Sequence, residues 1–89
     1  MCRNIRTLFN YESPATEEEI FASSLQYVRK ISGYRDPSQT NTAAFNRAVS
    51  EVSMATRKLL ESLTTSSKPR NREAEAIQAR ERYQKRNHS

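Results

Sequence analysis

Large apolar side chains are scarce in this sequence, and nearly all of them lie in its first three quarters. Isoleucine, leucine, valine and phenylalanine account for 15 of 89 residues, and 14 of these precede residue 68. A chain with so few sits near the lower limit of self-sufficient folding. Residues 68–89 contain only Ile77. The sequence therefore predicts one small domain over residues 1–67 and a tail over 68–89 that cannot build its own core.

Charge divides at the same place. The chain has 15 Lys and Arg against 10 Asp and Glu, a formal net charge of +5. Seven of the bases and three of the acids fall in residues 68–89, so the tail carries most of the net positive charge. Just before it, residues 64–69 are polar and end in a proline that disfavours helix at Lys68. We therefore predict a linker at this junction.

A helix over residues 16–32 has recognisable signals at both ends. Thr16 and Glu19 have the spacing of a capping box, in which each side chain accepts a hydrogen bond from the other residue's backbone amide. Gly33 can adopt the left-handed conformation that ends a helix. Between them, apolar residues recur at the spacing of one helix face: Ile20, Phe21, Leu25, Tyr27, Val28 and Ile31.

A second helix is predicted over residues 38–63. Ser38, Thr40 or Asn41 could cap its start. Apolar residues then recur at helical spacing, namely Phe45, Val49, Val52, Leu59, Leu60 and Leu63. The small residues Ala44, Ala48 and Ala55 lie on the same face and would allow a neighbouring helix to approach closely. Because the connection between the two helices is short, they should be neighbours, antiparallel or steeply crossed, with their apolar stripes in contact.

The two ends of the chain leave alternatives open. Residues 2–11 fit either a short helix or an extended arm packed across the helix pair, and a lone strand would have nothing to pair with. In the tail, Asn71 could cap a marginal helix with Glu73 and Glu75 in its first turn. The predicted fold is thus all-α: a two-helix core, an N-terminal arm or short helix, and a basic C-terminal helix or tail.

Several classes of function are disfavoured by composition. No apolar run approaches the roughly 18 residues that span a bilayer, so no membrane role is expected. One cysteine and one histidine give neither a disulfide framework nor a metal cluster, and a single glycine does not make a phosphate-cradling loop. We expect a cytoplasmic protein without a cofactor, and the sequence leans away from an enzyme.

The order of several short blocks resembles a known family. The blocks are Met1–Ile5, Pro14–Thr16 with Glu19–Ile20, Leu25–Gly33, Pro37–Ser38 and Ala44–Phe45. Together they resemble an uncharacterised bacterial family, the domain-of-unknown-function family numbered 2277, over residues 1 to about 65. The resemblance implies a bacterial cytoplasmic protein. It supplies no activity, substrate or catalytic residue.

Two clusters contain residue types that catalytic sites use. Cys2, followed by Arg3, would be a reactive thiol if the neighbouring cations favoured the thiolate. Nucleophilic catalysis needs a positioned base, however, and the only histidine is His88. The carboxylates of residues 17–19 point about 100° apart on a helix and cannot converge on one atom, so helix capping accounts for them. Cys2 remains a weak catalytic candidate.

Cations at two places suggest contact with phosphate. Arg29 and Lys30, with Tyr34 and Arg35 beside them, could hold a phosphate backbone and stack on an unpaired base; the plainer interpretation makes these cations partners of the helix dipole. The tail adds Arg70, Arg72, Arg80, Arg82, Lys85 and Arg86. Interspersed acids also fit a solubilising tail or a docked third helix.

The leading hypothesis is a small non-enzymatic binding module that contacts nucleic acid through phosphate. The alternative is a helical adaptor that binds another helical protein or forms a homodimer, with no role in nucleic-acid binding. A thiol-based enzyme or sensor ranks third.

Overall fold

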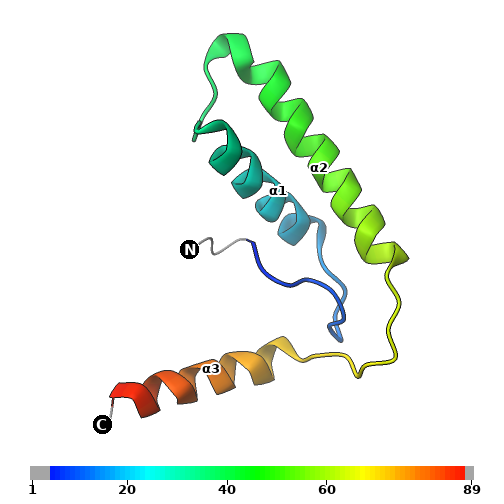
Figure 1. Ribbon diagram of the computed structural model, residues 1–89, viewed down its shortest axis with the longest axis vertical. Coiled ribbons are helices and arrows are strands. Elements are labelled where there is room, and N and C mark those ends of the chain that lie inside the picture. Colours follow the sequence, from blue (N-terminus) through cyan, green and yellow to red (C-terminus); the bar gives the residue numbers. More distant parts are fainter. Residues whose placement is uncertain (1–4, 88–89) are drawn as a thin grey trace.

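The computed structural model describes residues 5–87, and side chains through residue 85. Its elements, in chain order, are α1 (Glu17–Ser32), a 3₁₀ turn η1 (Gln39–Asn41), α2 (Thr42–Ser62) and α3 (Arg72–Asn87). Helices α1 and α2 form an antiparallel hairpin, and α3 projects away from it beyond a long linker (Figure 1). Over the described residues there is no strand element. The predicted all-α fold is confirmed.

Helix α1 is closed at both ends by the residues that the sequence indicated. The Thr16 hydroxyl accepts from the Glu19 amide at 3.1 Å, and a Glu19 carboxylate oxygen accepts from the Thr16 amide at 2.9 Å. Gly33 has a φ of 79°, and its amide donates to the carbonyl of Arg29 at 2.9 Å. The left-handed φ favours glycine because a Cβ would strain the backbone there.

Helix α2 begins later than predicted. Residues 39–41 form the 3₁₀ turn instead, with the Asn41 amide donating to the Ser38 carbonyl at 2.9 Å. The side chain of Asn41 donates to the Ser38 and Tyr34 hydroxyls and makes no cap bond to the helix. The candidate cap thus ties the turn to the preceding loop, and the helix starts at Thr42.

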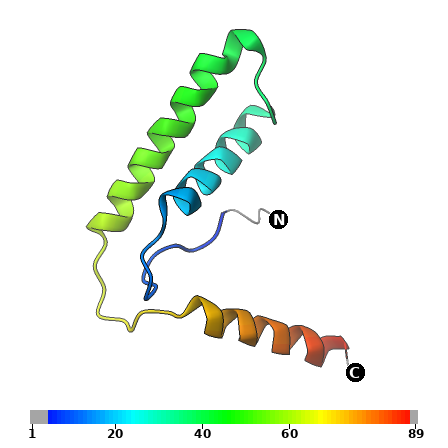
Figure 2. The ribbon, with the colours of Figure 1, turned by 180° about the vertical axis from the view of Figure 1, so that it is seen from behind.

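The hydrophobic core lies between α1 and α2 and is small. Its centre is Val28, Phe45 and Val49, with partly buried Leu25, Ala48 and Val52 packed against it. Ser24 is buried among these residues because its hydroxyl donates to the Ile20 carbonyl at 2.8 Å, which satisfies its polar group. Figure 2 shows from behind that α1 and α2 lie side by side.

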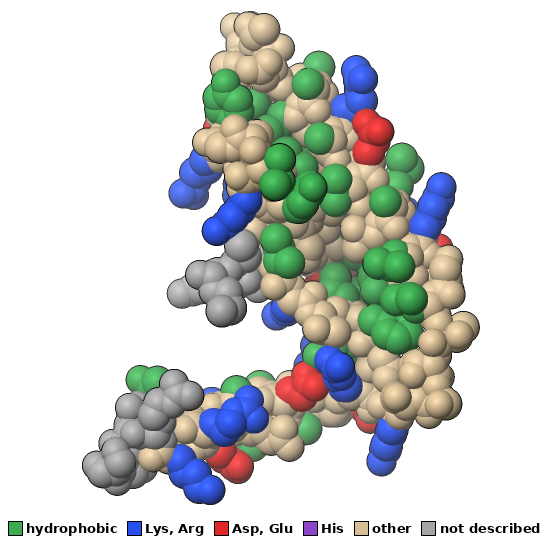
Figure 3. Space-filling model, in the orientation of Figure 1, with side chains coloured by type: hydrophobic (Ala, Val, Ile, Leu, Met, Phe, Trp, Pro, Cys, Tyr) green, Lys and Arg blue, Asp and Glu red, His purple; other side chains and the backbone are tan. Residues whose placement is uncertain are grey.

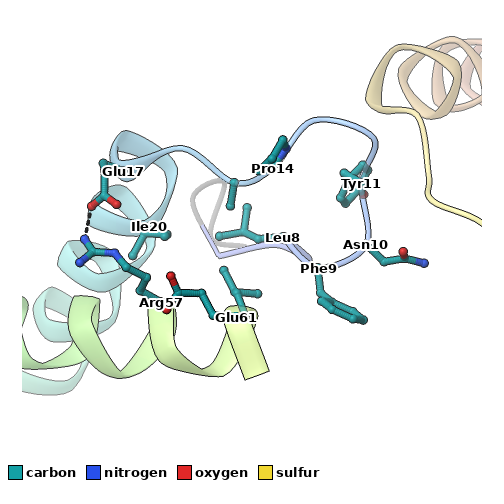
Figure 4. A pocket seen from close by; sticks show the side chains of 11 residues that line it. Leu8, Phe9, Asn10, Tyr11, Pro14, Glu17, Ile20, Arg57 and Glu61 are labelled. Carbon is teal, nitrogen blue, oxygen red and sulfur yellow. Dashed lines mark hydrogen bonds and ion pairs between the residues drawn. The ribbon is translucent and has the colours of Figure 1, made fainter. Parts of the chain in front are cut away.

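The described part of the N-terminal segment is an extended arm, not a short helix. Leu8 is buried beside Ile20, and the arm continues to Asn10 and Tyr11 near the linker (Figure 4). The extended backbone of the arm pairs with the linker at Arg70. The Arg70 amide donates to the Asn10 carbonyl at 2.8 Å, and the Glu12 amide donates to the Arg70 carbonyl at 2.9 Å. The linker therefore supplies the pairing that the hairpin lacks.

Helix α3 stands apart from the helical hairpin. The Asn71 side chain accepts from the Ala74 amide at 2.8 Å, as the predicted cap should. Among the described residues, α3 meets α1 through the contact of its first residue, Arg72, with Glu19, and its remaining length packs against neither α1 nor α2. Its larger apolar residues, Ile77 and Tyr83, are exposed. Within residues 5–87, no helix combines the length and apolar character that crossing a membrane requires.

The capping box predicts a measurable stability difference. Thr16→Ala removes the hydroxyl that accepts from the Glu19 amide, so the free energy of unfolding should fall by about 1 kcal/mol. Urea unfolding followed by circular dichroism measures it. Thr40→Ala is the matched control, since the Thr40 side chain is exposed in the 3₁₀ turn and makes no hydrogen bond to a described residue. Equal losses in the two variants would contradict the capping role.

Candidate nucleic-acid interface

A basic recess lies at the C-terminal end of α1. It is an open hollow of about 720 Å³, and we call it the basic recess; its lining residues are Gln26, Arg29, Lys30, Gly33, Tyr34 and Arg35. The left-handed Gly33 turns the chain, so that Tyr34 and Arg35 lie beside the last turn of α1. The Nε of Arg29 donates to the Arg35 carbonyl at 2.9 Å and holds this loop in place.

The recess has a clear positive charge. Three of its lining residues are cations and none is a carboxylate. The side chains of Lys30 and Arg35 are exposed and make no hydrogen bond or ion pair with the described residues. The end of a helix contributes only about half a negative charge, which three cations outweigh. The recess can therefore attract an anion, and two of its cations are free to bind one.

Tyr34 gives the recess an aromatic surface. The residue is 43% exposed, and its hydroxyl accepts from the Asn41 side chain at 3.4 Å. That contact ties the ring to the 3₁₀ turn while leaving much of the side chain open. An exposed aromatic ring beside cations is the arrangement on which unpaired bases stack in sequence-tolerant nucleic-acid binding.

The free half of α3 carries a second group of cations, Arg80, Arg82 and Lys85. They are exposed and form no ion pair with another described residue, so the Glu81–Lys85 pair that the spacing allows is not made. Tyr83, between them in sequence, is 68% exposed. The side chain of Arg86 lies outside the described part. These cations are spread around the helix and do not form one face.

Arg70 and Arg72 belong to a different structure. Arg72 lies over the Tyr11 ring, 4.7 Å from its centroid, and Arg70 lies 5.8 Å from it. The Tyr11 hydroxyl donates to a Glu75 carboxylate oxygen at 2.6 Å. Arg72 also pairs with Glu19 at 3.4 Å. We call these five residues the arm junction, because they fix the start of α3 to the arm and to α1.

The arm junction was not visible in the sequence. Tyr11 and Glu75 are 64 residues apart, and no local pattern joins two residues at such a separation. Arg70 and Arg72 look like the other tail cations, but their guanidinium groups already face an aromatic ring and carboxylates. The sequence does bring Arg29, Lys30, Tyr34 and Arg35 together, because a single helix end and its loop contain all four.

Glu19 is the charged centre of the arm junction. The amide of Thr16, hydrogen-bonded to the Glu19 carboxylate, lowers its pKa most, and the cations of Arg72 and Arg6 lower it further, while burial opposes them. Arg6 lies 3.2 Å from this carboxylate. These partners all favour the ionised form, so the pKa of Glu19 lies below its ordinary value.

A second hollow and the candidates for metal binding or catalysis can be compared with the basic recess. A hollow of about 360 Å³ between the arm and α2 is bordered by Leu8 and Pro14 and by the Glu17–Arg57 ion pair (Figure 4). Glu17 and Arg57 neutralise each other, which leaves Glu61 as the one unpaired charge among the residues that line this hollow. In the part of the chain that the structure describes, no group of three His, Cys, Asp or Glu residues could hold a metal. Cys2, the weak catalytic candidate, lies outside the described residues.

The fold and the recess define a small all-α protein with an open basic surface at one helix end. The chain belongs to the DUF2277 family of uncharacterised conserved proteins, whose family model matches residues 1–78. The matched region contains the basic recess and the arm junction and ends before Arg80. Comparison with curated proteins gives no match, and neither does comparison with solved structures.

The lowered pKa of Glu19 has a consequence for stability. A carboxylate whose pKa is lower in the folded chain than in the unfolded chain stabilises the fold above its ordinary pKa, here 4.5. That contribution disappears as the pH falls through the lower, folded-state pKa. Glu19→Gln keeps an oxygen for the capping box but loses the charge, so it should cost about 1 kcal/mol at neutral pH and much less at about pH 3.

Urea unfolding at both pH values tests this. Glu18→Gln is the control, because Glu18 is exposed, one position away, and forms no ion pair with the described residues. Its effect should be small at both pH values. A loss for Glu19→Gln that is the same at both would contradict an electrostatic role.

Proposed function

We propose that the protein is a non-enzymatic module that binds nucleic acid through its phosphates, with the basic recess as the main contact. The observation that carries this is the gathering of three cations and a partly exposed tyrosine around one hollow that has no carboxylate in its lining. Lys30 and Arg35 have side-chain donors free for phosphate oxygens. The single cysteine and the family resemblance support a setting in the bacterial cytoplasm.

The recess favours a single strand over a duplex. Cations contact phosphates of either form, but an aromatic ring can stack only on a base that is not already paired within a helix. Tyr34 supplies that ring. The mechanism is therefore electrostatic attraction followed by stacking of one base. It discriminates little between nucleic-acid sequences.

Helix α3 supplies a secondary contact. Beyond its first residue it packs on no other helix among the described residues, and Arg80, Arg82 and Lys85 remain unpaired. Figure 3 shows Lys and Arg side chains on α1 and on α3, on either side of the open space between them. Cations distributed around a helix suit phosphate tracking. Arg70 and Arg72, which we first expected among the contacts, are left out because the arm junction already uses them.

Binding of a labelled single-stranded RNA, followed by fluorescence anisotropy, tests the proposal. The full chain should bind, and its affinity should fall steeply between about 50 mM and about 200 mM salt, because phosphate contacts release counterions. Arg35→Gln should weaken binding about threefold to tenfold and reduce the slope of log affinity against log salt by about 0.7. The Arg35 carbonyl that accepts from Arg29 is unchanged in this variant.

The control is Arg47→Gln, the same substitution at an exposed arginine of α2 outside the recess. It changes the net charge equally and should alter affinity little. If both variants weakened RNA binding equally, the RNA would be attracted by the overall charge of the protein and not by a particular site. Binding that ignores salt, or no binding at low salt, would overturn the proposal.

A further inference from the structure

The helices of this protein form a single layer. The molecule measures 51 × 36 × 16 Å. Seen down the shortest axis, α1 and α2 lie beside one another, α3 points away below them, and no helix covers the front or back of the hairpin (Figure 1, Figure 2). Folded domains normally bury each helix stripe between at least two layers. One face of this hairpin is therefore covered only in part, by the arm residues Ile5 to Phe9 that border its lower half.

An apolar groove runs along that face. It consists of two adjoining hollows of about 380 and 390 Å³ that share Tyr27 and Val52. Ile31 at one end is 72% exposed and Leu59 towards the other is 56% exposed. Hydrophobic side chains extend along both helices on the face shown in Figure 3. Such a continuous exposed apolar surface marks a contact site.

The exposed area is large enough for a stable dimer. The chain exposes 7465 Å², whereas a compact monomer of 10.3 kDa would expose about 5,400 Å². A standard interface covers about 800 Å² of each partner. Part of the excess belongs to the isolated α3, but less than half of it would provide such an interface.

The sequence of α2 suits a second copy of itself. Beside its core-facing stripe runs a row with the alternating spacing of three and four residues that helix pairs use as their seam. The row consists of Ala48, Val52, Ala55 and Leu59. Ala48 and Val52 lie where this row borders the core, whereas Phe45, which precedes them, is buried in the core. Large and small side chains alternate along it. In an antiparallel pair centred between Val52 and Ala55, every layer sets a large residue against a small one.

This register can be followed layer by layer. Val52 meets the second copy's Ala55, and Leu59 meets its Ala48. A parallel pair would set Leu59 against Leu59 and Ala55 against Ala55, which leaves gaps at the alanines. Complementary packing of large against small side chains is what close-packed helix interfaces require. The pattern thus selects the antiparallel arrangement of two identical helices.

Charges beside the seam agree with the same register. In an antiparallel pair, residues that flank the seam on the side away from α1 meet across it, and here Glu51 meets Lys58 of the second copy. The two-fold symmetry makes this pair twice. Within the described chain neither side chain forms an ion pair. An antiparallel pair centred on Glu51 would instead set the two Glu51 side chains against each other, and one centred on Lys58 would do the same with the two lysines.

We propose that two copies of the chain associate through the apolar groove, with α2 antiparallel to α2, to form a four-helix bundle from two hairpins. Four helices in two layers are the arrangement that a hairpin with one open face can complete. The three cations of the basic recess and the free half of α3 lie outside the α2 seam, while Tyr34 borders both the recess and the groove. The proposal does not depend on nucleic-acid binding.

Sedimentation equilibrium of the full chain, in the presence of a thiol reductant, tests the dimer. The chain should be dimeric at tens of micromolar. Ala55→Glu buries two carboxylates in the central layer and should raise the dimer dissociation constant by about a hundredfold or more. Met54→Glu adds the same charge one residue away, on a 50% exposed side chain outside the seam, and should leave the constant nearly unchanged.

Charge reversal tests the register. Glu51→Lys and Lys58→Glu each create like-charge pairs across the two-fold axis and should each weaken the dimer by about tenfold. The double variant restores opposite charges and should recover most of the affinity. Both positions are exposed, so the fold survives, and circular dichroism confirms it. A monomer at about 100 µM, equal weakening by Ala55→Glu and Met54→Glu, or a double variant that fails to recover would overturn the proposal.

Discussion

The carboxylate of Glu19 joins three parts of the chain that are far apart in sequence. It accepts from the Thr16 amide at the start of α1, and it pairs with Arg6 of the arm and with Arg72 at the start of α3. The two ion pairs share one side chain that is only 16% exposed, so each is less screened than a fully exposed surface pair would be. The helix cap fixes where this carboxylate lies. The positions of the arm at Arg6 and of the start of α3 at Arg72 therefore depend on a local feature of α1.

Local signals predicted the parts of this fold that local interactions determine. Thr16, Glu19 and Gly33 marked the ends of α1 because a cap involves residues only three or four positions apart. The predicted start of α2 at residue 38 was too early because residues 39–41 form a 3₁₀ turn. Asn41, one of the three candidate caps, does precede the helix, although its side chain binds Tyr34 and Ser38. The pairing of the arm with Arg70 lies about 60 residues away along the chain. Hydrophobic periodicity carries no information on contacts of that kind.

The residues of the candidate site also differ in whether local sequence could predict their role. The basic recess could be predicted because its cations and its aromatic ring lie within one helix end and the following loop. The role of Arg70 and Arg72 could not, because a cation over Tyr11 has the same sequence appearance as a solvent-exposed one. Arg70 and Arg72 differ from the solvent-exposed cations because a carboxylate and an aromatic ring lie beside their guanidinium groups. Only folding of the arm against the linker brings those partners to it.

The small core and the open apolar groove are two aspects of one constraint. Few large apolar residues are available, and α1 and α2 cover them incompletely, since Leu59 and Ile31 remain exposed beside the core. A second copy would cover this exposed surface, so association would add the buried apolar area that the monomer lacks. It would also place two basic recesses on one rigid body. A single strand long enough to reach both would be held by two weak phosphate contacts, the second of which forms at high effective concentration. Dimerisation would thereby raise affinity for long strands while leaving the cations of the recess, which do not line the groove, free for phosphate.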